Sequence, residues 1–163
     1  MSTFAAAIDP LLKREGSRYV ADDHGRGPSK WGITLATLRE LMPTATAADI
    51  QALGPAQASV VYRVLFWQRY RLALIDEQAL ATKLLDLAVN LGGGTAVKLL
   101  QRAVGVQDDG VLGPKTAAAV NSRPGPLVLE QLRTEAAQRY RNIVLAHPEW
   151  QEDLAGWLVR LSQ

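Results

Sequence analysis

The side chains best suited to chemistry stand close together near the N-terminus. Glu15 is followed by Asp22, Asp23 and His24, with Ser29 shortly after. Breaking a glycosidic bond needs one carboxylic acid that protonates the leaving oxygen and a second polar group across the bond. Glu15 is therefore a candidate general acid on the rim of a sugar-binding cleft, and Asp22 and Asp23 are candidates for the second group. We expect Ser29 to position a water molecule and His24 to contact substrate.

Each of these residues also has a plainer interpretation, as a solvated acid on the surface or at a turn. No phosphate-binding glycine loop, nucleophile elbow or metal-ligand spacing offers a rival chemistry. The chain has no cysteine and only two histidines, which argues against a thiolate zinc site and against a histidine-rich metal centre. We therefore expect carboxylate chemistry that needs no metal and no cofactor.

The candidate acids lie at the end of one expected helix and in the loop that follows it. Apolar residues at helical spacing predict a helix over 4–15, with Gly16 as its stop signal. The stretch 14–34, which includes Glu15 and Gly16, contains four glycines, a proline and three carboxylates. Long loops in compact domains are usually functional. Thr34 is expected to cap the next helix, over 35–42. A short β-ribbon in the loop, around 19–20 and 31–33, is the only strand pattern.

The rest of the chain reads as helices separated by glycine and proline signals. The expected spans are 47–53, 55–71, 76–91, 96–104 with Thr95 as its cap, 114–121, 127–146 and a closing helix that carries Trp150 and Trp157. The predicted fold is mostly α. We expect a catalytic segment over 1–92 and a C-terminal helical segment over 93–163, packed into one globule.

Three further polar or aromatic residues on expected helices are candidates for binding substrate. Asp86 and Asn90 are four residues apart and therefore neighbours on one helix surface. They could line the cleft, or they could bond neighbouring groups from a half-buried helix. Tyr62 could contact a sugar, although a tyrosine at this spacing is more often part of the core.

Much of the chain resembles the N-acetylmuramidase family known as glycoside hydrolase family 108. The first segment resembles its motifs at Glu15-Gly16, Tyr19-Val20, Asp22, Trp31-Gly32-Ile33-Thr34, Tyr62-Arg63 and Phe66-Trp67. The second resembles the segment of these enzymes labelled a predicted peptidoglycan-binding region, at Asp86 to Gly92, Leu100-Gln101, Gly105, Asp109 to Pro114, Thr116, Gly156-Trp157-Leu158 and Arg160.

This resemblance implies a lysozyme-like helical fold that cleaves the glycan of bacterial peptidoglycan between N-acetylmuramic acid and N-acetylglucosamine, with Glu15 as the acid. The chain departs from the family pattern in the loop. Either Ser17 stands where a second glycine is usual, or a residue inserted before Tyr19 displaces that glycine. The loop is about one residue shorter, and Ser29 replaces a threonine but keeps the hydroxyl. Which of Asp22, Asp23 or His24 fills the second role is left open.

The composition suits an ordinary soluble globular protein, with 163 residues, 48% hydrophobic and 21% charged residues and a net charge of +2. We expect bacterial peptidoglycan as partner, no nucleic acid, no stable membrane insertion and a monomer. Because no signal peptide or long apolar run is visible, we expect synthesis in the bacterial cytoplasm and release to the wall through a holin or a secretion system. Two alternative functions are a non-catalytic wall-binding module and an enzyme that cleaves another bond of the wall, such as an amidase.

Overall fold

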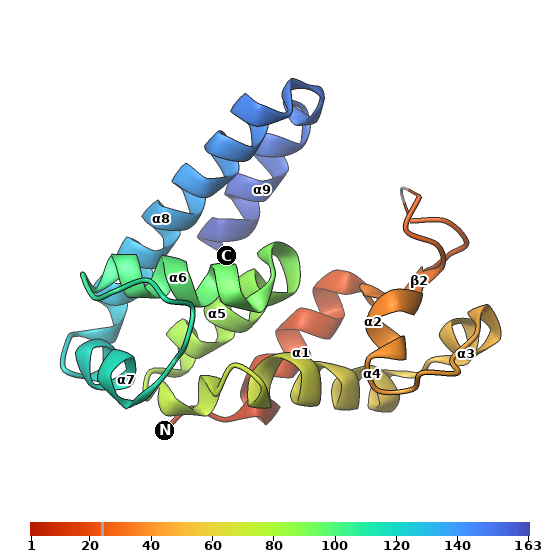
Figure 1. Ribbon diagram of the computed structural model, residues 1–163, viewed down its shortest axis with the longest axis horizontal. Coiled ribbons are helices and arrows are strands. Elements are labelled where there is room, and N and C mark those ends of the chain that lie inside the picture. Colours follow the sequence, from red (N-terminus) through yellow and green to blue (C-terminus); the bar gives the residue numbers. More distant parts are fainter. Residues whose placement is uncertain (24) are drawn as a thin grey trace. The chain divides into compact units, whose positions relative to one another are not determined.

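Helices dominate the computed structural model, which describes residues 1–23 and 25–163 (Figure 1). This confirms the mostly α fold with a short β-ribbon that the sequence predicts. The contacts divide the chain into one unit over Thr3–Arg69 and another formed by Met1–Ser2 with Tyr70–Gln163. The two units are described in turn.

The first unit begins with the helix that carries Glu15. Helix α1 spans Phe4–Glu15, and the Thr3 side chain caps it by accepting a hydrogen bond from the Ala6 amide at 3.4 Å. Its apolar face is buried, with Leu11 2% exposed. This face contacts helix α4, Pro55–Tyr62. The expected helix and its stop at Gly16 are therefore confirmed.

The loop after α1 forms a small antiparallel sheet in the order β1-β2-β3. The strands are β1 (Tyr19–Val20), β2 (Ser29–Lys30) and β3 (Ile33–Thr34). In the central strand, Ser29 faces Val20 on one side and Thr34 on the other. The ribbon predicted around 31–33 is corrected in one respect, because Trp31 and Gly32 form the turn between β2 and β3 instead of a strand.

Three further helical segments complete the first unit. Thr34 caps α2 (Leu35–Arg39) through the Thr37 amide, as expected, although α2 ends before the predicted 42. Helix α3 (Ala47–Ala52) starts with a capping box formed by Thr46 and Asp49. Helix α4 continues into a π-helix, η1 (Arg63–Gln68), so the helix predicted over 55–71 changes geometry after Tyr62.

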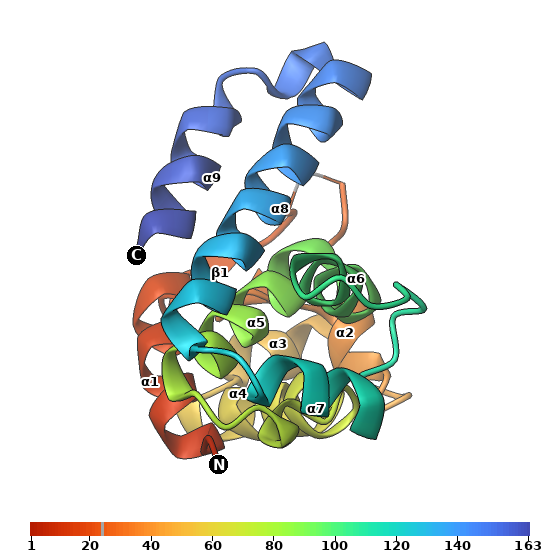
Figure 2. The same ribbon diagram turned by 90° about the vertical axis from the view of Figure 1, so that its left-hand side faces the viewer.

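The second unit is built around a buried helix. Its elements are η2 (Leu72–Leu74), α5 (Gln78–Leu91), α6 (Gly93–Ala103), α7 (Pro114–Asn121), α8 (Gly125–Ala146), η3 (Pro148–Trp150) and α9 (Asp153–Ser162). Leu80, Leu84 and Leu87 of α5 are 0% exposed. Helix α6 contacts both α5 and α8, and α8 and α9 run side by side as an antiparallel hairpin (Figures 1 and 2).

Two local features of this unit come from packing. Helix α6 starts at Gly93, earlier than the expected cap at Thr95. A side chain at Gly93 would overlap the Tyr70 ring. The turn at Asp109-Gly110 forms around Gln101, which is 1% exposed. Gln101 Nε2 donates to Asp109 Oδ1 at 2.7 Å, and the Gly110 amide donates to Gln101 Oε1 at 2.8 Å. The Gln101 hydrogen bond lowers the pKa of Asp109.

Candidate active site

Glu15 is the last residue of α1 and is half-buried. The chain leaves the helix at Gly16, whose amide donates to the Leu12 carbonyl oxygen at 3.0 Å and whose φ is +70°. A left-handed φ favours glycine, which lets the chain turn away sharply at this position. The helix therefore ends at Glu15, and the loop that follows turns back across it.

The Glu15 carboxylate lies directly against the backbone of Gly32. A side-chain carbon at Gly32 would sit 2.6 Å from Glu15 Oε2 and 2.8 Å from the Tyr62 hydroxyl oxygen. Both distances are shorter than van der Waals contact, so only glycine leaves room for the two groups. The carboxylate and the phenol are consequently close neighbours over the β2–β3 turn.

The β2–β3 turn is held in an unusual backbone conformation. Trp31 has φ +56° and Gly32 has φ +70°, and a two-residue hairpin turn of type I′ requires positive φ at both positions. For tryptophan this region is sterically unfavourable. Two hydrogen bonds hold it there: the Tyr62 hydroxyl donates to the Trp31 carbonyl oxygen at 2.6 Å, and the Trp31 indole donates to the Leu53 carbonyl oxygen at 3.0 Å.

Tyr62, predicted as a substrate contact, is 1% exposed. Its ring packs beside Phe66 with the centroids 5.7 Å apart, and its hydroxyl supports the turn. The structure therefore brings Tyr62 to the candidate acid as a positioning residue, while its predicted contact with sugar stays a prediction. Sequence reasoning did not assign roles to Trp31 and Gly32. The available signal was a Trp-Gly pair between two short strands, which is compatible with a primed turn.

Asp22 and Asp23 lie in the loop between β1 and β2. Asp22 is exposed, and its Oδ1 accepts a hydrogen bond from the Gly27 amide at 3.1 Å. Asp23 is half-buried, and its Oδ1 lies 3.5 Å from a guanidinium nitrogen of Arg26. Both acids thus help to close the loop. His24, the third candidate here, lies outside the described residues.

Ser29 sits in the central strand and is 5% exposed. Its neighbour Lys30 extends from the sheet to α3, where Nζ donates to the Gln51 carbonyl oxygen at 2.7 Å. The backbone pairing of Ser29 with Val20 and Thr34 joins the acidic loop to the turn that supports Glu15. Its predicted role in orienting water stays a prediction.

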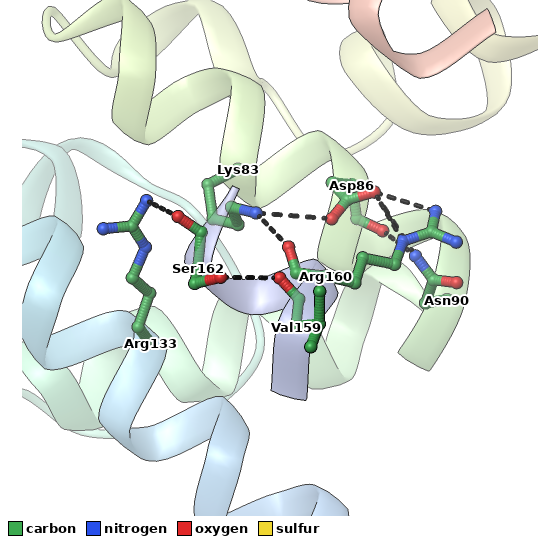
Figure 3. Close-up of polar contacts among 7 residues, drawn as sticks. All are labelled: Lys83, Asp86, Asn90, Arg133, Val159, Arg160 and Ser162. Carbon is green, nitrogen blue, oxygen red and sulfur yellow. Dashed lines mark hydrogen bonds and ion pairs between the residues drawn. The ribbon is translucent and has the colours of Figure 1, made fainter. Parts of the chain in front are cut away.

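Asp86 and Asn90, the other two predicted substrate contacts, lie on α5 in the second unit. Figure 3 shows the Asp86 carboxylate facing Arg160 of α9 and Lys83 of its own helix. Arg160 Nη2 and Nε lie 2.8 Å and 3.1 Å from Asp86 Oδ1, and Lys83 Nζ lies 3.7 Å from Oδ2. Asn90 Nδ2 donates to the Asp86 carbonyl oxygen at 2.6 Å. The alternative in which these residues bond neighbouring groups therefore has direct support.

This ion network is buried and connects three helices. Asp86 is 4% exposed and Lys83 is 5% exposed, and Lys83 Nζ also donates to the Arg160 carbonyl oxygen at 2.9 Å. Arg133 of α8 donates to the Ser162 carbonyl oxygen at 3.3 Å, near the end of α9 (Figure 3). Burial and the nearby Asp86 charge raise the pKa of Tyr140 on α8 to about 12. The network fixes the last turns of α9 against α5 and α8.

Among residues 1–23 and 25–163, no three His, Asp or Glu side chains are grouped so that they could hold a metal ion.

Comparison with known proteins now decides the family. Residues 8–92 match the family described as Glycosyl hydrolase 108, which is more than half of the chain. The chain belongs to this family. Residues 95–162 match a second family, described as "Predicted Peptidoglycan domain". The two matches identify a glycoside hydrolase that acts on peptidoglycan, and they confirm the resemblance found in the sequence motifs.

A solved structure supports the fold of this family 108 hydrolase. The chain is similar to the structure of Brucella abortus SagA, with 29% sequence identity and a TM-score of 0.79, over 97% of this chain and 92% of that chain. No curated protein matches. None of the helices in the described part of the chain is long and apolar enough to cross a membrane.

Replacing Arg160 by methionine tests the ion network. Arg160→Met keeps most of the apolar stem but removes the guanidinium that lies 2.8 Å from the buried Asp86 carboxylate. We expect the free energy of unfolding, measured by urea denaturation, to fall by about 3 kcal/mol. Removing one partner of a buried ion pair leaves the other charge desolvated without a compensating interaction. The control is Arg102→Met, which removes the half-exposed pair with Asp108 at 2.7 Å and should cost much less. Equal losses from both variants would show that the network does not stabilise the unit.

Proposed function

We propose that this family 108 hydrolase cleaves the peptidoglycan strand between N-acetylmuramic acid and N-acetylglucosamine, with Glu15 as the general acid. The observation that carries the proposal is the position of the Glu15 carboxylate, fixed against Gly32 and beside Tyr62. Catalysis by proton transfer depends on a donor held within hydrogen-bond reach of the reacting oxygen. The position of Glu15, a half-buried acid at the end of a helix and against the β2–β3 turn, supports this role.

The chemistry follows from the needs of the glycosidic bond. Glu15 donates its proton to the bridging oxygen as the bond to the sugar carbon breaks, so the leaving sugar departs as a neutral alcohol. Positive charge then develops on the remaining sugar ring. A second carboxylate must either stabilise this charge or activate the water molecule that attacks the ring. The acidic loop between β1 and β2 supplies the candidates for that second group.

Of the two acids in the loop, we assign the second role to Asp22. The Asp23 carboxylate is paired with Arg26, whose positive charge offsets its own. Asp22 is exposed, and its hydrogen bond with the Gly27 amide holds the side chain without neutralising it. A charged, exposed and oriented carboxylate suits the stabilisation of a cationic sugar. Ser29 then supports this loop from the central strand.

The first test is Glu15→Gln, which keeps the side-chain shape against Gly32 but removes the acid. We expect hydrolysis of purified peptidoglycan to fall by at least about 100-fold, because general acid catalysis contributes factors of this size. The matched control is Glu40→Gln, an exposed residue of the same unit that pairs with Arg69, which should keep full activity. The assignment of Glu15 is falsified if Glu15→Gln hydrolyses the wall at near wild-type rates.

Mass spectrometry of the released fragments tests the bond in the same assay. Fragments with reducing N-acetylmuramic acid ends support the proposed bond. Reducing N-acetylglucosamine ends, or free stem peptides, would instead assign the activity to the other glycosidic bond or to an amide bond.

The choice between the two loop acids is tested by comparing Asp22→Asn with Asp23→Asn. Asparagine at position 22 can still accept from the Gly27 amide, so the loop keeps its anchor while losing the charge. We expect Asp22→Asn to lower kcat by more than about tenfold and Asp23→Asn to lower it by much less. Melting temperatures confirm that both variants are folded. A larger loss in Asp23→Asn would transfer the role to Asp23.

The support beneath the acid is tested by Gly32→Ala, which places a carbon where the Glu15 carboxylate lies. We expect kcat to fall by more than about tenfold, because misplacing a catalytic group by about 1 Å can cost factors near 100. Gly105→Ala is the matched control: its φ of +67° gives similar backbone strain, and a side-chain carbon there has open space around it. If both variants lose activity equally, backbone strain alone explains the effect and Gly32 has no special role.

A further inference from the structure

The far end of the α8–α9 hairpin carries a cluster of four rings that the catalytic proposal does not use. We call this cluster, made by Tyr140, His147, Trp150 and Trp157, the aromatic tip. Trp150 stacks on His147 with ring centroids 4.5 Å apart and an interplanar angle of 24°. Trp157 contacts Trp150 edge-on at 6.5 Å and lies 5.2 Å from Tyr140.

The exposure of these rings increases towards the end of the hairpin. Tyr140 is 4% exposed, Trp157 is half-buried, and Trp150 is 42% exposed. Tyr140 of α8 and Trp157 of α9 contact each other between the two helices. Figures 1 and 2 both show the connection between α8 and α9 standing clear of α5, α6 and α7. Trp150 therefore keeps an exposed apolar surface beyond its contacts with His147 and Trp157.

Such a ring is prepared for binding. Its orientation is already fixed by His147 and Trp157, so little side-chain entropy is lost when a ligand stacks on it. Indole combines an electron-rich face with a polar N–H, and aromatic residues of this kind dominate the energetics of binding surfaces.

The charges around the aromatic tip indicate which ligand it fits. Glu149, Glu152 and Asp153 flank Trp150, and the chain has no lysine or arginine from 142 to 159. His147 Nδ1 lies 3.3 Å from Glu149 Oε1. Anionic lipid surfaces attract clusters of lysine and arginine, and would be repelled by these carboxylates. A neutral ligand with one apolar face and several hydroxyl or amide donors fits both the indole and the acids.

We propose that the aromatic tip binds N-acetylhexosamine rings of the peptidoglycan glycan, with Trp150 as the stacking platform. The ring C–H groups of a pyranose lie on the indole face, while its hydroxyl and acetamido N–H groups donate to the carboxylates of Glu149, Glu152 or Asp153. The cluster lies within residues 95–162, which match the "Predicted Peptidoglycan domain", a match that names no binding residues. The proposal is independent of the role assigned to Glu15.

A second binding site would help an enzyme that hydrolyses an insoluble polymer to stay attached to it. Binding of one glycan segment at the aromatic tip converts later encounters with the wall into intramolecular ones, at an effective concentration set by the tether. We therefore expect the aromatic tip to matter for hydrolysis of intact sacculi and to matter little for short soluble glycans.

The test compares the full chain with Trp150→Ala, Trp150→Phe and Leu145→Ala. Leu145 is the control because it is aliphatic, 79% exposed and close to the end of α8. Binding of each protein to purified sacculi is measured by co-sedimentation in the cold, and binding to tetra-N-acetylchitotetraose by NMR of the indole N–H signals. We expect Trp150→Ala to weaken both by about tenfold, Trp150→Phe to recover part of the loss, and Leu145→Ala to bind as wild type does.

Three results would overturn the proposal. The first is Trp150→Ala binding sacculi as tightly as wild type. The second is an equal loss in Leu145→Ala, which would indicate unspecific apolar adhesion. The third is a loss of binding to phosphatidylglycerol vesicles without any loss on sacculi, which would assign the aromatic tip to membranes. The Trp150 variants are judged by binding, and Glu15→Gln is judged by hydrolysis. Failure of one proposal can therefore be told apart from failure of the other.

Discussion

The position of the Glu15 carboxylate depends on the missing side chain at Gly32. The carboxylate occupies the space that a Cβ would fill, so the end of α1 and the β2–β3 turn fit together only with glycine there. That turn also keeps Trp31 in a left-handed conformation. Strained backbone of this kind persists where its surroundings over-determine it, here through hydrogen bonds with Tyr62 and Leu53. The proposed acid is therefore positioned by the core of its unit and not by the loop alone.

The second unit uses two different interactions to hold one helix. Near its C-terminal end, α9 is attached through Arg160 to the buried Asp86 of α5. One turn earlier, Trp157 packs on Tyr140 of α8. A buried ion pair contributes little net stability but strongly disfavours any arrangement that leaves one charge unpaired. The ion network thus specifies how α9 lies, the inner rings add apolar contact, and Trp150 remains at the end of the hairpin with much of its surface exposed.

Local sequence signals predicted most helices because the residues that start or end a helix lie within a few positions of each other. The cap at Thr34, the capping box at Thr46 and Asp49 and the break after Leu91 needed no distant partner. The differences arise where distant contacts intervene. Gly93, the first residue of α6, lies against the Tyr70 ring, and η1 adopts π geometry in the same stretch where Trp67 packs edge-on against Phe4 at 5.8 Å. Helix propensity carries no information about such neighbours.

By itself, the sequence determined the helical class, the family motifs and the choice of Glu15 as candidate acid, because residue types and their spacing carry those signals. Only the tertiary structure showed that Tyr62 supports a strained turn, that Gly32 leaves room for the carboxylate, and that Arg160 is the partner of Asp86. Asp86 and Arg160 lie on different helices and are 74 positions apart in the chain. Contacts between residues so far apart are set by how the helices pack, and no local pattern encodes them.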